Sequence, residues 1–235
     1  MSGGFPGKTP PGFAPSPQVI QTMRQAFSLH QQGQLAQAAT LYREVLTMQP
    51  DNPDALHFLG VLESQRGQRE AGLSLIDRAV KVNPRNAAAL YNRAGILRDM
   101  ARLDEAVESY DRALALKADH HAALNNRGAV LHDLKRYEEA VASFDRAIAI
   151  KADHIDAHAN RGTTLVVLER FEEALQSFER ARALGSADAA AHFGRGNALA
   201  GLGRPEDALA AFDTALELTP YDARILNNRG TVLAR

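Results

Sequence analysis

Four asparagines recur at a fixed interval, and they are the side chains of this sequence best suited to binding chemistry. Asn92, Asn126 and Asn160 are spaced 34 residues apart, and Asn228 stands two such intervals after Asn160. A carboxamide carries both hydrogen-bond donors and an acceptor, so a row of them could hold the backbone of an extended peptide without reading its side chains. The alternative is that asparagine merely tolerates a solvated helix face in a duplicated repeat.

Patterns typical of catalysis or metal binding are weak. His154 and His158 have the spacing of two ligands on one helix, but no glutamate lies between them in the zincin arrangement. The sequence has no cysteine, which excludes disulfides, thiolate catalysis and cysteine zinc sites. We find no glycine-rich phosphate loop and no nucleophile elbow. We therefore expect no catalytic residue, metal or cofactor here, although the chain could be part of an enzyme.

The asparagine interval belongs to an internal repeat of the whole chain. Sliding the window His121–His154 by 34 residues aligns Leu124, Gly128, Ala140 and Phe144 with similar residues in the neighbouring windows. A period of this length excludes most folds built around a single core. We predict six complete units and the start of a seventh, with the bounds 19–52, 53–86, 87–120, 121–154, 155–188, 189–222 and 223–235.

Each unit is predicted to be an antiparallel pair of helices. Apolar residues recur every three or four positions over 122–134 and again over 137–150, which places each set on one helix face. The turn between the two halves contains glycine in several units, as at Gly67 and Gly203. If the halves fold about this turn, Gly128 faces Phe144, and the same relation joins Gly162 to Phe178 and Gly196 to Phe212. The aromatic ring would fill the space of the missing side chain.

An arginine interrupts the apolar stripe of the first helix, directly after the asparagine position. The series comprises Arg93, Arg127, Arg161, Arg195 and Arg229. Folding about the turn puts a carboxylate of the same unit opposite four of them, in the pairs Arg93–Asp111, Arg127–Asp145, Arg161–Glu179 and Arg195–Asp213. We predict a salt bridge within each unit at a partly buried site.

The composition is that of a globular chain with balanced charge. The formal net charge is -1, so no field favours nucleic acid or an anionic membrane. No apolar run approaches the length that spans a bilayer, and no basic segment followed by an apolar one marks a secretory signal, so we expect a cytoplasmic protein. Residues 1–18 contain five of the ten prolines and four glycines, and are predicted to be a disordered arm.

Together the 34-residue period and the recurring Leu, Gly, Ala and Phe positions resemble the tetratricopeptide repeat. The arginine series and the residues Ala118, Ala152 and Ser186, in place of a closing proline, depart from the pattern. The resemblance implies an all-α fold, a right-handed α-solenoid of antiparallel helix pairs, whose first helices line a concave groove. The asparagine row, interrupted by Phe58 and Gly194, further resembles the superhelix of the O-linked N-acetylglucosamine transferases and their bacterial relatives, where such a ladder holds substrate polypeptide.

The resemblance assigns a set of candidate peptide-binding residues to the concave face. They are Asn92, Asn126, Asn160, Asn228, Tyr91, Asn125, His132, Phe193, Asn197 and Asn227. No lysine occupies these inner positions, which disfavours the clamp by which another class of these repeats binds a C-terminal carboxylate.

Three functions are compatible with the sequence. The first is a non-catalytic scaffold that binds a peptide or helix of a partner protein in the groove. A second is the substrate-recognition part of a glycosyltransferase that resembles the O-linked N-acetylglucosamine transferases, with catalysis encoded elsewhere. The third is a structural protein that polymerises end to end through its uncapped repeats. The apolar stripe of residues 223–235 has no partner helix within the repeat pattern, so we expect either that the chain is the front portion of a longer polypeptide or that the stripe mediates self-association.

Overall fold

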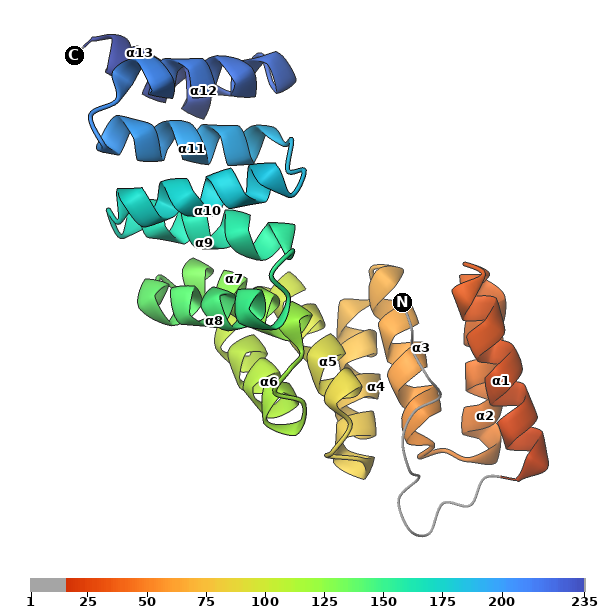
Figure 1. Cartoon of the computed structure of the whole chain (residues 1–235). Coiled ribbons are helices and arrows are strands. Elements are labelled where there is room, and N and C mark those ends of the chain that lie inside the picture. Colours follow the sequence, from red (N-terminus) through yellow and green to blue (C-terminus); the bar gives the residue numbers. More distant parts are fainter. Residues whose placement is uncertain (1–15, 235) are drawn as a thin grey trace. The chain divides into compact units, whose positions relative to one another are not determined.

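The computed structural model describes residues 16–234, and over this range it consists of helices and short connections (Figure 1). The chain divides into two compact units, and the boundary in the sequence falls between Ala118 and Asp119. The first unit contains α1 (Pro17–Gln31), α2 (Leu35–Met48), α3 (Pro53–Gln65), α4 (Arg69–Val82), α5 (Ala87–Asp99) and α6 (Leu103–Leu116). The second contains α7 (His121–Asp133), α8 (Tyr137–Ile150), α9 (Ile155–Val167), α10 (Phe171–Ala183), α11 (Ala189–Gly201), α12 (Pro205–Leu218) and α13 (Ala223–Leu233).

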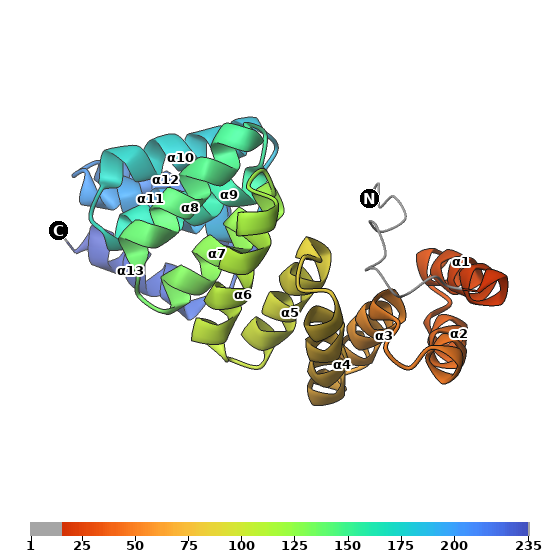
Figure 2. The same cartoon turned by 90° about the horizontal axis from the view of Figure 1, so that it is seen from below.

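Within each unit, helices adjacent in sequence pack as antiparallel pairs that stack on one another. In the first unit α1 pairs with α2, α3 with α4 and α5 with α6, and the pairs lie side by side in Figures 1 and 2. In the second unit α8 contacts both α7 and α9, and α10 contacts both α9 and α11. The predicted all-α helical repeat fold is therefore confirmed.

Local sequence signals account for the helix ends. The second helices other than α2 have carboxylates in their first turn, such as Glu138 and Glu139 in α8, which stabilise the positive end of the helix dipole. The turn inside each pair needs one residue in the left-handed region, and Gly67 supplies it with a φ of 84°. The structure requires the same conformation at Lys135, with a φ of 61°, and at Glu169, with a φ of 57°. Glycine is thus the preferred residue at this turn, but the fold imposes the conformation without it.

The first helix begins earlier than predicted. Helix α1 starts at Pro17, so residues 17 and 18 belong to it and the arm predicted over 1–18 is too long. Ser16 caps this helix by accepting a hydrogen bond from the Val19 backbone N–H, at 3.3 Å, and proline is well tolerated in the first turn. Residues 1–15, where the rest of the arm was predicted, lie outside the described part of the chain.

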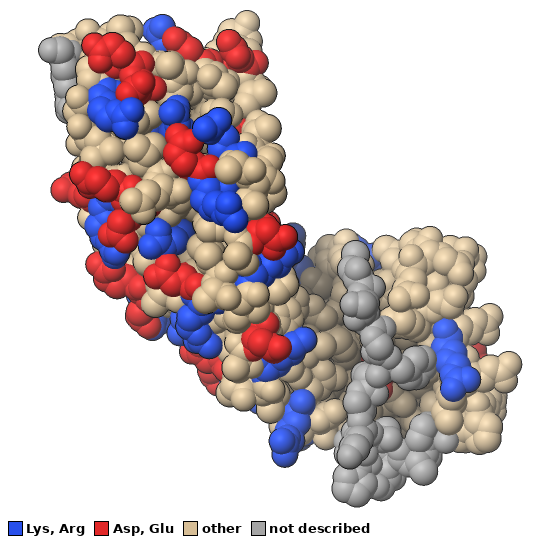
Figure 3. Space-filling view, in the orientation of Figure 1, with Lys and Arg blue, Asp and Glu red and all other residues tan. Residues whose placement is uncertain are grey.

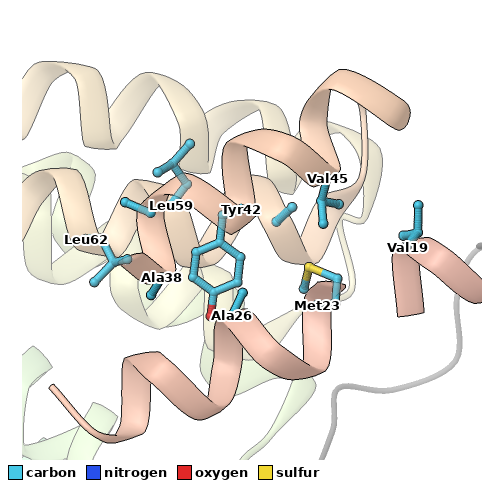
Figure 4. Close-up of a cluster of buried hydrophobic side chains, with 10 residues drawn as sticks. Val19, Met23, Ala26, Ala38, Tyr42, Val45, Leu59 and Leu62 are labelled. Carbon is cyan, nitrogen blue, oxygen red and sulfur yellow. The ribbon is translucent and has the colours of Figure 1, made fainter. Parts of the chain in front are cut away.

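Rings and small residues interlock in the core. A methyl group built on Gly128 would lie 2.6 Å from Phe144 Cε1, and the matching distances are 2.9 Å from Gly162 to Phe178 Cζ and 2.4 Å from Gly196 to Phe212 Cε1. The predicted contacts between glycine and aromatic residue are therefore confirmed. In the first pair the equivalent ring is that of Tyr42, which is fully buried among the aliphatic side chains shown in Figure 4.

The predicted pairing of each arginine with the carboxylate opposite it in its own repeat is wrong. Four of the arginines pair instead with that carboxylate of the preceding repeat, namely Arg93, Arg161, Arg195 and Arg229. Arg161 Nε donates to Asp145 Oδ1 at 2.6 Å, and its Nη1 donates to Ser177 Oγ of its own unit at 2.7 Å. The same shift pairs Arg93 with Asp77, Arg195 with Glu179 and Arg229 with Asp213, each at 2.6 Å. Arg93 and Arg127 likewise donate to the serine of their own unit, Ser109 and Ser143. In these four cases the arginine ties its helix pair to the pair before it.

Charged side chains of both signs lie on the surface of the second unit. Figure 3 shows acidic and basic side chains interspersed over the visible face of the second unit. Arg136 and Arg170 each form a two-pronged contact with the glutamate three residues ahead, Glu139 and Glu173. Among residues 16–234, none of the helices combines the length and the apolar character needed to cross a bilayer.

Candidate functional site

The first helices of the pairs contact one another and form a continuous wall within each unit. In the second unit α7, α9, α11 and α13 touch in succession, and in the first unit α3 touches α5. The asparagine row lies on these helices, at one register position of α5, α7, α9 and α13. The wall is therefore the candidate site.

In the second unit the amides of neighbouring first helices are bonded to each other. Asn160 Nδ2 donates to Asn125 Oδ1 at 3.1 Å, between α9 and α7. Asn228 Nδ2 donates to Asn197 Oδ1 at 2.8 Å, between α13 and α11. Within α7, Asn125 Nδ2 donates to Asn126 Oδ1 at 3.4 Å. These bonds fix Asn160 and Asn228 against the neighbouring first helix, so the row is pre-organised rather than a set of independent side chains.

In the first compact unit the asparagine of the row, Asn92, has a histidine as its hydrogen-bond partner. Asn92 Nδ2 lies 2.7 Å from His57 Nε2, so the ring nitrogen accepts and the imidazole is neutral. His57 is 4% exposed, and burial, together with the charge of His30, lowers its pKa to about 4. Phe58 occupies the ladder position of α3, where it stacks on His57 and on Tyr42. This end of the wall is therefore aromatic.

The second interruption of the row has a packing cause. A methyl group built on Gly194 would lie 2.3 Å from Phe178 Cζ. The ring of Phe178 thus lies between Gly162 of its own helix pair and Gly194 of the next one. An asparagine at position 194 would need this ring to move, so the gap in the row follows from the core.

The remaining predicted residues lie in several environments. Asn125 is buried, at 7% exposed, while Asn227 is exposed. His132 Nδ1 lies 2.9 Å from Thr164 Oγ1 and its ring packs on Tyr137. Tyr91 packs against the ring of Tyr110. Phe193 packs against Phe212 and lies beneath the guanidinium of Arg224.

One pocket in the second unit contains two of the predicted residues and several that the sequence did not reveal. Asn197 and Asn228 line a cavity of about 360 Å³ between α11 and α13. Its other lining residues are Phe171, Ala200, Gly201, Phe212, Thr231 and Val232. A comparison of equivalent positions could have indicated it, because α9 has Val166 and Val167 where α11 has Ala200 and Gly201.

The two histidines with helical ligand spacing contact different neighbours. The ring of His154 packs on that of His121, with centroids 5.1 Å apart. His158 Nε2 lies 3.1 Å from the carbonyl oxygen of Ala152. His158 is buried and occupies the position that leucine holds in α5 and α7, so it is part of the packing between helices.

Stacked helix pairs of constant length, with small residues under aromatic rings, define an α-helical repeat protein. Family models described as tetratricopeptide repeat match residues 29–96, 85–152, 119–187 and 160–223. The chain therefore belongs to the tetratricopeptide repeat family. No curated protein matches the chain at a significant level.

Several solved structures share this fold. YrrB, described as a tetratricopeptide repeat protein with an unusual peptide-binding site, has a TM-score of 0.71 and 20% identity, over 80% of this chain and 97% of its own. PilF of Pseudomonas aeruginosa has a TM-score of 0.78 and 18% identity, over 92% and 96%. PilW, a type IV pilus biogenesis factor, has a TM-score of 0.76 and 17% identity, over 93% and 100%. At these identities the likeness concerns the fold.

Proposed function

We propose that the chain is a non-catalytic protein-interaction scaffold that binds an extended peptide segment of a partner protein along its first helices. The observation that carries the proposal is the pairing of amides between neighbouring first helices, at Asn160–Asn125 and Asn228–Asn197. In each pair the donating amide, that of Asn160 or Asn228, keeps its second N–H and its Oδ1 for a peptide backbone, and fixing the amides beforehand lowers the entropy lost on binding.

Two further observations support a protein ligand. Tetratricopeptide repeats are generally modules of protein–protein interaction, and YrrB carries a peptide-binding site on the same fold. The candidate residues include aromatic and amide side chains but no lysine or arginine, and the chain as a whole has a net charge of -1. Such a surface offers little to a polyanion such as DNA or RNA.

The proposal can be tested with peptides selected from a displayed random library on the whole chain. Affinity is measured by calorimetry for the wild type, for the double variant Asn160→Ala with Asn228→Ala, and for Gln176→Ala. Gln176 is an exposed amide on the second helix α10 and serves as the control. We expect the double variant to bind at least about tenfold more weakly, with unchanged helicity, and the control to bind normally. Equal affinities in all three proteins would refute the groove as the site.

A second candidate function is substrate recognition for a glycosyltransferase resembling the O-linked N-acetylglucosamine transferases. The same row of amides favours it, because that is the feature on which the resemblance rests. The reading frame after the codon of Arg235 distinguishes the two functions. A sugar-nucleotide-binding domain there supports the transferase, and a stop codon contradicts it.

A third candidate is self-association through α13. Leu226 is 48% exposed and Leu233 is 58% exposed, whereas Leu124 and Leu131, which occupy the same positions of α7, are fully buried. Sedimentation equilibrium should show association that increases with concentration and is abolished by Leu226→Gln with Leu233→Gln. A wild type that remains strictly monomeric would exclude this function.

A further inference from the structure

A cavity lies between α11 and α13, and binding of a peptide backbone by the asparagine row does not require it. It lies entirely within the second unit, and its volume of about 360 Å³ falls within the range of small-ligand sites. Its base is aromatic, since Phe212 is fully buried there and Phe171 reaches it from the start of α10.

Two small residues of α11 open this cavity. Ala200 and Gly201 stand where α9 has Val166 and Val167 and where α7 has His132 and Asp133. A methyl group built on Gly201 would lie 2.6 Å from Phe171 Cδ1, so the ring of Phe171 lies against the bare backbone of the glycine. Because α7 and α9 form with larger side chains at these positions, the helix pair itself does not require the small ones.

Hydrogen-bonding groups remain available beside the aromatic base. Asn228 Nδ2 donates to Asn197 Oδ1, and within the described part of the chain neither Asn197 Nδ2 nor Asn228 Oδ1 has a protein partner. These two atoms, one donor and one acceptor, match the carbonyl oxygen and the N–H of a peptide unit.

The cavity lining determines which side chain can enter. Among residues 16–234, the cavity is lined by apolar, amide and hydroxyl side chains and by no charged one, so a charged side chain would lose its hydration without gaining a partner there. An aromatic side chain would bury its apolar surface and contact the rings of Phe171 and Phe212. Aromatic rings attract one another in edge-to-face or offset-stacked arrangements, so these two rings favour an aromatic ligand.

We propose that this cavity is a specificity pocket that receives an aromatic residue of the bound peptide, while Asn197 and Asn228 bind the flanking peptide units. The inference rests on the proposed function and adds to it a sequence preference. The amide row alone would accept any extended backbone, whereas the pocket selects the register in which an aromatic residue lies between α11 and α13.

The test uses nuclear magnetic resonance on the whole chain with two small probes, N-acetylphenylalanine methylamide and N-acetylalanine methylamide. We expect the phenylalanine probe to shift the side-chain amide signals of Asn197 and Asn228 saturably, and to bind at least about tenfold more tightly than the alanine probe. Equal binding of the two probes, or shifts confined to other residues, would overturn the proposal.

A matched pair of variants locates the effect. Ala200→Val introduces the residue that α9 carries at the same position, so it should fold while filling the cavity. Ala210→Val makes the same change on the exposed face of α12. We expect Ala200→Val to abolish the preference for the phenylalanine probe and Ala210→Val to preserve it. A preference that survives Ala200→Val would refute the pocket.

The same variants separate this inference from the proposed function. Library-selected peptides could bind the wild type and Ala200→Val equally but bind the double variant Asn160→Ala with Asn228→Ala more weakly. This result would support the proposed peptide-binding function and refute the aromatic pocket. If the phenylalanine probe binds the pocket but the double variant binds every selected peptide as tightly as the wild type, the pocket is supported and peptide binding by the asparagine row is refuted.

Discussion

Arg161 Nε donates to Asp145 Oδ1 at 2.6 Å, and this bond joins α9 to the second helix of the preceding pair. The arginine side chain is 19% exposed and the aspartate side chain 51%, so the pair lies at the edge of the interface between repeats. Stability in a repeat protein is approximately a sum of terms within repeats and terms between neighbours. The arginine series therefore contributes to the term between neighbours.

The first prediction concerns this pairing. In a double-mutant cycle of Arg161→Met and Asp145→Asn, the coupling free energy measured by urea unfolding should be about 0.5–1 kcal/mol, since the pair is half exposed. The matched cycle combines Arg161→Met with Glu179→Gln, which removes the carboxylate that a folding of the two halves about their turn would favour. Its coupling should be close to zero. A larger coupling with Glu179 than with Asp145 would mean that the arginine pairs with the carboxylate of its own repeat and would contradict the geometry.

The second prediction compares two glycines with opposite surroundings. Gly128→Ala should destabilise the fold by about 1–3 kcal/mol, because its methyl group meets the ring of Phe144. Gly95→Ala should stabilise it by about 0.5–1 kcal/mol, because that position in α5 faces open space and alanine favours a helix. Thermal and urea unfolding measure both. The same sign of change for the two variants would contradict the packing described above.

The third prediction concerns pH. Burial lowers the pKa of His57 to about 4 in the folded protein, below the value of 6.5 that is normal for histidine. Between these values the unfolded chain binds the proton more readily than the folded one. The stabilisation is complete above pH 6.5 and is lost as the pH falls towards 4, by at most about 3 kcal/mol.

The variant His57→Gln isolates this effect, because glutamine can still accept from Asn92 but does not titrate. The free energy of unfolding is measured from pH 7.5 to pH 4 for both proteins. The wild type should lose stability faster on acidification than the variant. Asp54, whose pKa burial raises to about 6, titrates in the same interval with the opposite sign, so only the difference between the two proteins is diagnostic. Parallel profiles would show that His57 is readily protonated in the fold.

Contacts inside a repeat could be predicted from the sequence, because they depend mainly on a local turn. The position of that turn aligns Gly128 with Phe144, and the structure confirms it. The arginine partner could not be found in the same way. Ser143 and Asp145 are two residues apart on α8 and so point about 200° apart, which gives Ser143 to the arginine of its own pair and Asp145 to that of the next.

The hydrogen bonds and the cavity along the first helices could not be predicted from the sequence. The asparagine positions were visible as a periodic series, but their bonds to Asn125, Asn197 and His57 depend on how far apart neighbouring first helices lie. The cavity beside Asn228 depends on side-chain size at two positions of α11, which a hydrophobic pattern does not distinguish. Periodicity predicts which residues share a face, and it does not predict the gaps between them.

Phe178, held between Gly162 and Gly194, has a consequence for any polypeptide lying along the second unit. Such a chain would be hydrogen-bonded by the amides of α7 and α9 and again by those of α11 and α13. Its residues between these two places would face the gap in the asparagine row at Gly194. These residues could vary freely among natural ligands, so partners of one scaffold would share two short conserved segments at a constant separation.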